Sequence, residues 1–413
     1  MKESPTNDAL LLYAPVPLYR DEKGELLVER QAVNGLRLWA ENFSRVTVMM
    51  PLDPASSPRG WERLSDVASR LDRVQFEPLP MAYRPDQFFR HLPATRRRIQ
   101  KLISEAQWLS FAIGGLFGDW GAVASFTAYR MKRPFAVWTD RVESEIVRQE
   151  AGTGPWKARL RRRLAHRPMA ALERAVIRRA TLGLFHGRET YEAYAPFSRG
   201  PAEVVHDIHL GPRDHIAPER LATKAGGASE GPLRLIYTGR ADPMKGPFDW
   251  IEVLKHLSDM GVDFRARWLG DGSERAGMIA QIAKAGLQDR VEMPGFVDDR
   301  TAVLEELRNA HVFLFCHLTP ESPRCLIEAL ASGCPLVGYE SAYPDDLIAA
   351  HRGGILVPRG DKVSLAKELA DLDADRRQLS NLMLAAAADG APFTDEAVFR
   401  HRSNIIRRHL AEG

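Results

Sequence analysis

The chain has 413 residues, of which 45% are hydrophobic and 27% are charged, and this length exceeds what one compact core usually holds. The formal net charge of +3 is too small for a general nucleic-acid binder. No apolar run approaches a membrane span, the first residues lack a signal-peptide pattern, and the three cysteines suit neither a disulfide framework nor a zinc site. We therefore expect two domains in a cytoplasmic protein that has no nucleic-acid partner.

The first half of the chain alternates strand-like and helix-like segments. Buried strands are predicted at residues 10–13, 46–50, 109–113, 135–138 and 182–185. Amphipathic helices fit between them, and buried strands that alternate with helices form parallel sheets covered on both faces. Residues 1–223 are therefore expected to form one doubly wound α/β domain.

A basic segment, residues 157–179, lies in this first domain. It carries nine Lys or Arg residues against a single acid, Glu173, and apolar residues such as Leu160 and Leu164 recur at roughly helical spacing. A basic amphipathic helix can lie on an anionic membrane surface, which would place the protein at the inner face of a membrane. The pattern is equally typical of an ordinary helix with a solvated charged face, and the sequence leaves both interpretations open.

The chain changes character at residues 224–231, which are small and polar and lack periodicity, so we predict a linker there. Residues 232–394 then repeat the alternation and are expected to form a second domain of the same class. Its strands are predicted at residues 233–237, 266–269, 290–293, 312–316, 336–339 and 355–357. A helix is expected within residues 395–413, which can pack back on the first domain. Two such domains in series place a ligand cleft between the carboxyl ends of their strands.

The most informative stretch is residues 319–333. Ser322 is a good helix N-cap, and Pro323 and Arg324 then open a helix whose first backbone N–H groups favour an anion. Glu328, near the start of this helix, can accept hydrogen bonds from sugar hydroxyls beside that anion. A phosphate at a helix start next to hydroxyls at a carboxylate describes a nucleotide sugar. The plain alternative is a capped helix with a solvated glutamate.

A second motif follows the strand predicted at residues 233–237. Gly239 leads into a loop with two cations, Arg240 and Lys245, at the carboxyl end of the strand and beside a helix start. Two cations there can hold a diphosphate, because charge-assisted hydrogen bonds contribute about 1.5–3 kcal/mol each. A Rossmann dehydrogenase is disfavoured, since Gly270-Asp271-Gly272 is followed by no third glycine.

Together these motifs resemble the donor-nucleotide domain of the large retaining glycosyltransferase family numbered four, whose GT-B fold pairs two Rossmann-like domains. The resemblance covers about a third of the chain and keeps the family's order of motifs. The matching elements are Thr238-Gly239-Arg240, Lys245-Gly246, residues 269–275, Pro294-Gly295-Phe296-Val297, residues 319–333 and residues 353–358.

The resemblance implies a role for each matching residue. Arg240 and Lys245 would hold the donor diphosphate and stabilise the charge that develops on the departing group, and Glu328 would bind the ribose hydroxyls. Two residues, Phe296 and Val297, would face the nucleobase. The nucleotide site would be completed by Gly239, Ser322, Pro323 and Arg324.

The first acid of the family's pair is out of register in this chain. The family usually separates its two acids by seven residues, whereas Glu321 and Glu328 have six between them, so Pro320 occupies the expected position. We expect a rearranged loop that lets Glu321 still reach the donor sugar, and the alternative is that this contact is lost. Asp140, which follows the strand at residues 135–138, is the candidate for orienting the acceptor or the donor sugar, although a plain loop acid is equally consistent.

Such a transfer expels a nucleoside diphosphate through an oxocarbenium-like transition state, and fixed cations and helix dipoles can stabilise that leaving group without a metal. No metal-binding acid motif occurs at a predicted strand end, so no metal or other cofactor is expected. The leading hypothesis is a retaining glycosyltransferase that acts on a glycan or lipid-linked acceptor in bacterial cell-envelope or exopolysaccharide synthesis. The alternatives are a nucleotide-sugar epimerase or hydrolase of the same fold, and a catalytically degenerate nucleotide-binding module.

Overall fold

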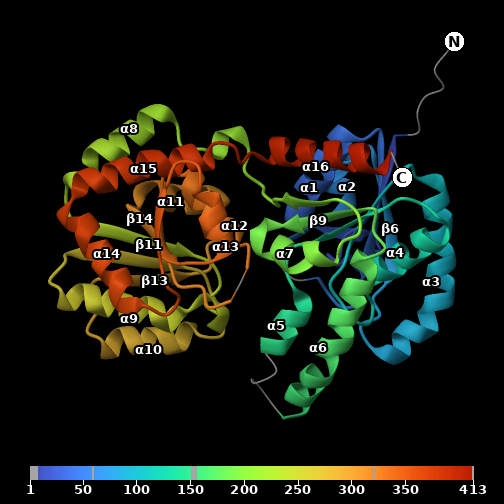
Figure 1. Ribbon diagram of the computed structural model, residues 1–413, viewed down its shortest axis with the longest axis horizontal. Helices are drawn as coiled ribbons and strands as arrows, with labels where there is room; N and C mark the ends of the chain where they lie inside the picture. Colours follow the sequence, from blue (N-terminus) through green and yellow to red (C-terminus); the bar gives the residue numbers. More distant parts are fainter. Residues whose placement is uncertain (1–7, 58–59, 150–155, 320, 412–413) are drawn as a thin grey trace. The chain divides into compact units, whose positions relative to one another are not determined.

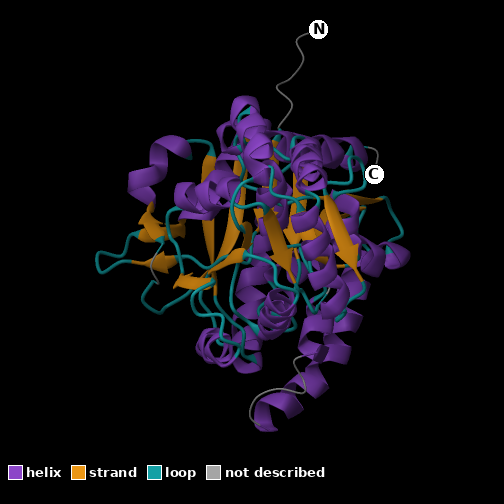
Figure 2. Ribbon diagram, turned by 90° about the vertical axis from the view of Figure 1, so that its left-hand side faces the viewer, coloured by secondary structure: helices purple, strands orange, loops and turns teal. Residues whose placement is uncertain are grey.

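A computed structural model describes residues 8–57, 60–149, 156–319 and 321–411 (Figure 1). The chain divides into two compact units, which we call the first unit (Met1–His209 with Asp395–Gly413) and the second unit (Leu210–Thr394). In both units the strands lie between helices, as Figure 2 shows. None of the helices in the described part of the chain combines the length and hydropathy that a bilayer crossing needs.

The first unit contains a parallel sheet with the strand order β10-β9-β8-β7-β1-β4-β6. Its strands are β1 (Ala9–Tyr13), β4 (Arg45–Leu52), β6 (Val74–Pro80), β7 (Trp108–Ala112), β8 (Ala136–Thr139), β9 (Leu182–His186) and β10 (Ala202–Val205). A small antiparallel sheet is made by β2 (Tyr19–Arg20), β3 (Leu26–Glu29) and β5 (Trp61–Arg63). The helices are α1 (Arg30–Asn42), α2 (Leu64–Val67), α3 (Pro85–Glu105), α4 (Trp120–Arg130), α5 (Glu143–Gln149), α6 (Trp156–Ile177), α7 (Gly187–Tyr194) and α16 (Asp395–Leu410).

The core of the first unit occupies both faces of its main sheet. Successive residues of β1 point to opposite faces, so Leu10 joins one buried cluster and Leu11 joins the other. Both faces are covered by helices, which is why β1 is apolar throughout instead of alternating with polar residues. The sequence-predicted strands of this half all occur, displaced by a residue or so at their ends.

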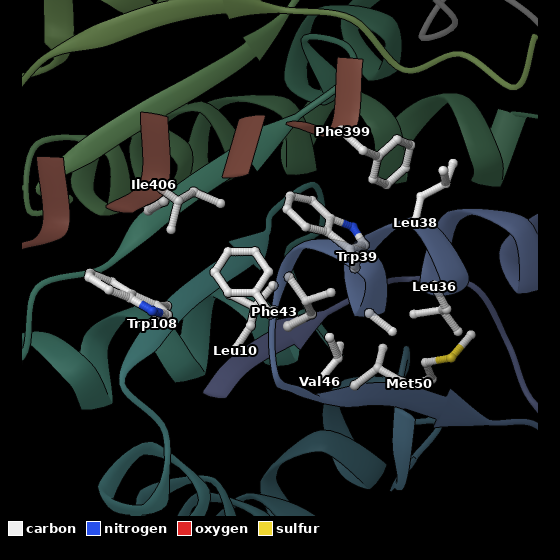
Figure 3. Close-up of a cluster of buried hydrophobic side chains, with 14 of the residues drawn as sticks. Leu10, Leu36, Leu38, Trp39, Phe43, Val46, Met50, Trp108, Phe399 and Ile406 are labelled. Carbon is white, nitrogen blue, oxygen red and sulfur yellow. The ribbon is translucent and has the colours of Figure 1, made fainter. Parts of the chain in front are cut away.

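The C-terminal helix α16 packs on the first unit. Phe399 and Ile406 of α16 point into the cluster formed around Trp39 and Phe43 of the α1 region (Figure 3). The rings of Trp39 and Phe399 meet edge to face with their centroids 5.2 Å apart. Each buried aromatic or aliphatic side chain of this kind contributes about 1.5–3 kcal/mol, so α16 is an integral part of this core.

The second unit contains a parallel sheet with the strand order β13-β12-β11-β14-β15-β16, the doubly wound order of a Rossmann fold. Its strands are β11 (Leu233–Thr238), β12 (Phe264–Leu269), β13 (Val291–Gly295), β14 (Val312–Phe315), β15 (Leu336–Tyr339) and β16 (Gly354–Val357). The helices are α8 (Pro218–Gly226), α9 (Pro247–Asp259), α10 (Arg275–Lys284), α11 (Arg300–Asn309), α12 (Arg324–Ala331), α13 (Ala342–Leu347), α14 (Lys362–Ala374) and α15 (Arg376–Gly390).

The linker expected at residues 224–231 is wrong. Residues 224–226 end α8, a 3-10 turn follows at Gly227–Ser229, and the two units divide before Leu210 instead. Small, polar residues suggested an exposed segment, but Ala225 and Ala228 are buried. Lys224 Nζ donates to the carbonyl oxygens of Leu307 at 3.3 Å and Ser332 at 3.1 Å, and burial among these helix ends lowers the pKa of Lys224 to about 8. The segment therefore packs on the second unit.

Candidate functional site

The candidate site lies at the carboxyl ends of β11 and β14. These two strands pair in the middle of the second sheet, where Leu235 lies opposite Val312. The strand order reverses at this point, because β12 and β13 continue on the β11 side while β15 and β16 continue on the β14 side. Ligands of open parallel sheets bind outside the carboxyl ends of the strands at such a reversal. The two motifs singled out from the sequence follow these two strands.

Close backbone packing brings the loop after β11 against the end of β14. Gly246 has φ +62°, and a Cβ at this position would lie 1.9 Å from the carbonyl oxygen of Cys316. The backbone N–H of Leu318 donates to the carbonyl oxygen of Met244 at 2.9 Å. A side chain at position 246 would push the loops apart, so this glycine fixes the place of Lys245 beside the loop that carries Glu321.

Lys245 and Glu321 form a nearly buried ion pair. Lys245 Nζ lies 2.6 Å from Glu321 Oε2, and the two side chains are only 9% and 14% exposed. The sequence predicted a role for both residues but not this contact between them. A lysine held here presents a fixed positive charge at the carboxyl edge of the sheet, already balanced by one carboxylate. The structure thus brings the out-of-register Glu321 to the cation expected to grip a diphosphate.

Two further buried polar residues extend this pair. The hydroxyl of Tyr237, in β11, lies 2.9 Å from His317 Nε2, and His317 Nδ1 lies 3.7 Å from Glu321 Oε1. Burial, with the nearby charge of Lys245, lowers the pKa of His317 well below its ordinary value, so the imidazole is neutral. Burial also raises the pKa of Tyr237, so its phenol stays protonated. The sequence analysis missed both residues, although polar side chains at the ends of buried strands were the available signal.

The two cations predicted to act together differ in their surroundings. The side chain of Arg240 is 69% exposed and forms a 2.9 Å ion pair with Asp242, which is 22% exposed. Lys245 is buried with Glu321. Exposed pairs are weak, so Arg240 can change partner at small cost, whereas Lys245 is held in place. Gly239 precedes Arg240, and the backbone of Gly270 packs closely against it. A Cβ on Gly270 would lie 1.9 Å from the carbonyl oxygen of Gly239.

The helix expected to begin after Ser322 begins later. Helix α12 starts at Arg324 and its N-cap position is Pro323, which has extended backbone angles and supplies no side-chain cap. The prediction of Ser322 as the N-cap and Pro323 as the first helical residue is therefore wrong by one residue. The difference lies at Pro323 itself, whose ψ of 133° is extended, so it takes the N-cap position in place of Ser322. Pro320 lies outside the described residues.

Glu328 lies inside α12 and is already paired. Its Oε1 is 3.3 Å from Arg300 Nη1, and its side chain is 19% exposed while that of Arg300 is 42% exposed. Arg300, at the start of α11, was not predicted. It neutralises the carboxylate that is expected to bind ribose hydroxyls, and its exposure leaves it free to move. Beyond β13, Phe296 is 72% exposed and Val297 is partly buried, so the Phe296 ring is open to a ligand.

Asp140 belongs to the first unit. It follows β8 directly and is exposed at the carboxyl edge of that sheet, as the sequence predicted. In the same edge, the buried carboxylate of Asp119 accepts hydrogen bonds from the backbone of Gly114, Gly115 and Ala122. Burial raises the pKa of Asp119 to about 6 despite those bonds. Asp119 thus shapes the loop after β7 that contains Gly114 and Gly115.

The sequence predicted no metal ion, and the described residues were compared with that prediction. Within residues 8–57, 60–149, 156–319 and 321–411, no three His, Cys, Asp or Glu side chains gather in a way that could hold a metal ion. Metal independence therefore remains a proposal for a direct test.

Comparisons with known proteins relate the second unit to a known family. Residues 220–388 match the family model described as glycosyl transferases group 1. The chain is 32% identical over 49% of its length to WcaL of Escherichia coli, assigned as a colanic acid biosynthesis glycosyltransferase, and 30% identical over 50% to the amylovoran biosynthesis glycosyltransferase AmsK of Erwinia amylovora. The alignments span 58% and 52% of those relatives, so the chain spans little more than half their length.

The fold has close counterparts among solved structures. Anabaena HepE, solved in complex with UDP, superposes with a TM-score of 0.67 at 15% identity over 98% of this chain and 100% of that chain. A likeness at this identity concerns the fold. Residues 220–388 are therefore similar to the glycosyl transferases group 1 family, and the two Rossmann-like units of the chain are those of the GT-B fold.

Proposed function

We propose that this chain is a retaining, metal-independent glycosyltransferase that moves a sugar from a nucleoside diphosphate sugar to a glycan or lipid-linked acceptor. The observation that carries the proposal is the buried Lys245–Glu321 pair at the strand-order reversal of the second sheet. The relatives assigned to colanic acid and amylovoran synthesis favour exopolysaccharide or cell-envelope synthesis as the setting. The UDP bound to HepE supports a nucleoside diphosphate as the donor's leaving group.

The arrangement accounts for leaving-group stabilisation without a resident metal. Lys245 is buried beside Glu321, so a small movement of Nζ brings its charge to the diphosphate before the sugar–phosphate bond breaks. The exposed Arg240 can leave Asp242 and add a second cation on the diphosphate. Removing one such stabiliser typically lowers turnover by about 10²–10³-fold. Lys245 and Arg240 thus contribute both to diphosphate binding and to stabilisation of the transition state.

The rest of the donor has matching groups in the second unit. Glu328 would accept hydrogen bonds from the ribose hydroxyls, and Arg300 would keep that carboxylate aimed. The exposed ring of Phe296 would cover the nucleobase, together with Val297. Backbone groups of the Ser322, Pro323 and Arg324 segment would lie near the phosphates. Glu321, on the loop after β14, would contact the donor sugar in place of the family's usual first acid.

A hydrolase or epimerase of the same fold would share this donor site and differ in the nucleophile. A degenerate binding module would keep nucleotide affinity and lack turnover. The distinguishing experiment incubates the chain with UDP-, GDP- and ADP-sugars, with and without EDTA. It follows nucleoside diphosphate release and the anomeric configuration of the product by NMR. Release that survives EDTA, rises with an added glycan acceptor and retains configuration supports the proposal, and inversion or loss of release in EDTA overturns it.

A second proposal concerns the basic helix α6 and an anionic membrane surface. Trp156, Leu160 and Leu164 recur at four-residue spacing and are 64%, 49% and 68% exposed, so they form one apolar stripe facing solvent. Basic residues such as Lys157 and Arg163 are exposed on the same helix, while the side chain of Arg161 lies outside the described residues. An exposed apolar stripe bordered by cations suits the headgroup region of an anionic bilayer.

Vesicle binding tests this second proposal. The chain is mixed with vesicles rich in phosphatidylglycerol and with neutral phosphatidylcholine vesicles, at low and high salt. Salt-sensitive binding to the anionic vesicles that falls when Arg162 and Arg163 are changed to Gln supports docking through α6. Binding that is absent, or insensitive to both salt and substitution, leaves α6 as an ordinary surface helix.

A further inference from the structure

The Lys245–Glu321 pair is one end of a row of four buried polar groups. The row runs from the Tyr237 hydroxyl to His317 Nε2, from His317 Nδ1 to Glu321 Oε1, and from Glu321 Oε2 to Lys245 Nζ. Two of its contacts are hydrogen bonds, at 2.9 Å and 2.6 Å, whereas the 3.7 Å separation between His317 Nδ1 and Glu321 Oε1 is too long for one. Among the described residues, Glu321 Oε1 is buried and has no hydrogen-bond partner.

The proton positions in this row follow from its surroundings. A neutral imidazole has one nitrogen that donates and one that accepts. A carboxylate oxygen only accepts, so the unpartnered Oε1 of Glu321 that faces Nδ1 favours the tautomer with the ring proton on Nδ1. In that tautomer Nε2 accepts from the hydroxyl of Tyr237. Tyr237 therefore orients the imidazole, and its own ring is held against Trp268 with centroids 4.0 Å apart.

We propose that His317 is the positioning residue that holds Glu321 when Lys245 turns to the diphosphate of the donor. This inference rests on the proposed glycosyltransferase function. Without a donor, Lys245 holds Glu321 through Oε2. A diphosphate brings two or more negative charges and draws Nζ away, which would leave a buried carboxylate without a cation or donor, a costly state. A small approach of His317 Nδ1–H to Oε1 supplies the missing donor and keeps the carboxylate aimed at the sugar.

The same row explains how an acid one residue out of register keeps a defined position. The loop after β14 carries both His317 and Glu321, four residues apart, and His317 is 7% exposed. The imidazole is anchored to β11 through Tyr237, so the loop is tied to the neighbouring strand independently of the ligand. Glu321 thus has an anchored imidazole facing one oxygen and an exchangeable cation on the other.

Three substitutions of His317 distinguish the contact of Nδ1 with Glu321 from the contact of Nε2 with Tyr237. His317→Asn keeps an N–H donor near the Nδ1 position and loses the contact with Tyr237. His317→Gln keeps a polar group near the Nε2 position and loses the donor to Glu321, and His317→Leu loses both. We expect His317→Gln and His317→Leu to lower kcat by roughly 10- to 100-fold, because each loses one hydrogen bond to a charged group. The donor KM and the nucleoside diphosphate affinity should change less than about threefold. His317→Asn is expected to retain kcat within about threefold.

A spectroscopic measurement tests the contact without relying on turnover. In protein with ¹⁵N-labelled histidine, the Nδ1–H signal of His317, assigned by its loss in His317→Asn, should move downfield when nucleoside diphosphate is added. The Glu321→Ala variant should abolish that movement. Equal kcat in wild type and His317→Gln, or equal loss in His317→Asn and His317→Gln, would overturn the inference. If His317→Leu fails to fold, the two amide variants still decide between the outcomes. A wild-type chain that neither binds nor turns over a donor would instead refute the proposed function.

Discussion

Replacement of Lys245 by Met tests the buried pair most sharply. The substitution keeps an unbranched side chain and removes the charge, so Glu321 stays buried without its cation. Removal of one partner of a buried ion pair costs about 3–5 kcal/mol, and we expect the lower end because the two side chains are 9% and 14% exposed. For a unit of this size, about 3 kcal/mol corresponds to a fall of roughly 6–12 °C in the Tm of the second unit.

The double variant Lys245→Met/Glu321→Gln separates stability from function. Neither charge remains in it, so we expect it to recover about 2 kcal/mol of the loss while turnover stays at the level of the single variant. The matched control is Lys255→Met, because Lys255 forms a 2.7 Å pair with Asp259 while both side chains are more than half exposed. That change should cost less than about 0.5 kcal/mol.

The assay is thermal unfolding by calorimetry, with donor turnover measured on the same samples. A Lys245→Met variant that is as stable as wild type, or a double variant no more stable than the single one, would refute the reasoning. Either result would show that the charges do not depend on each other in the folded chain.

Three further predictions follow from other contacts. Arg240→Ala, which breaks only an exposed pair, should leave Tm unchanged by calorimetry and weaken nucleoside diphosphate binding roughly 10-fold by titration calorimetry; unchanged affinity would remove Arg240 from the donor site. Burial, with the charge of Arg234, lowers the pKa of His311 to about 3 in the folded chain. The free energy of unfolding is therefore highest above about pH 6.5. It falls as the pH drops toward 3, because the unfolded chain then binds a proton at His311 that the folded chain excludes. Urea denaturation at pH 7 and pH 5 should therefore show wild type losing about 2 kcal/mol more than His311→Asn, and equal losses would contradict the burial effect. Phe399→Ala should cost about 3–5 kcal/mol in denaturant unfolding followed by Trp39 fluorescence, and a cost below about 1 kcal/mol would mean that α16 is not part of the first core.

The periodicity of the sequence predicted both sheets because it reflects burial directly. Leu10 to Tyr13 and Val312 to Phe315 are buried in parallel strands. Continuous apolar runs of this kind are typical of strands whose two faces are both covered. The order of the motifs along the chain also predicted that the Lys245 and Glu321 loops follow the strands β11 and β14. What brings the loops together is pairing between strands distant in sequence, which is why their contact was not predicted.

The errors have local physical causes. Small residues suggested a linker, but Ala225 and Ala228 are buried, so the end of a helix was mistaken for part of a linker. Ser322 has the chemistry of an N-cap, but Pro323 itself is extended and the helix starts at Arg324. His317 and Tyr237 were missed because their significance depends on a contact between β11 and the loop after β14. Single-residue chemistry indicated the candidate side chains, whereas their partners came from the tertiary fold.

The most direct test of the donor site is an equilibrium titration of UDP, GDP and ADP into wild type and Lys245→Ala. A nucleoside diphosphate that binds wild type and loses roughly 10- to 100-fold in affinity with Lys245→Ala is the predicted result. Binding of none of the three to wild type, or equal binding to both proteins, would contradict the placement of the donor diphosphate at Lys245.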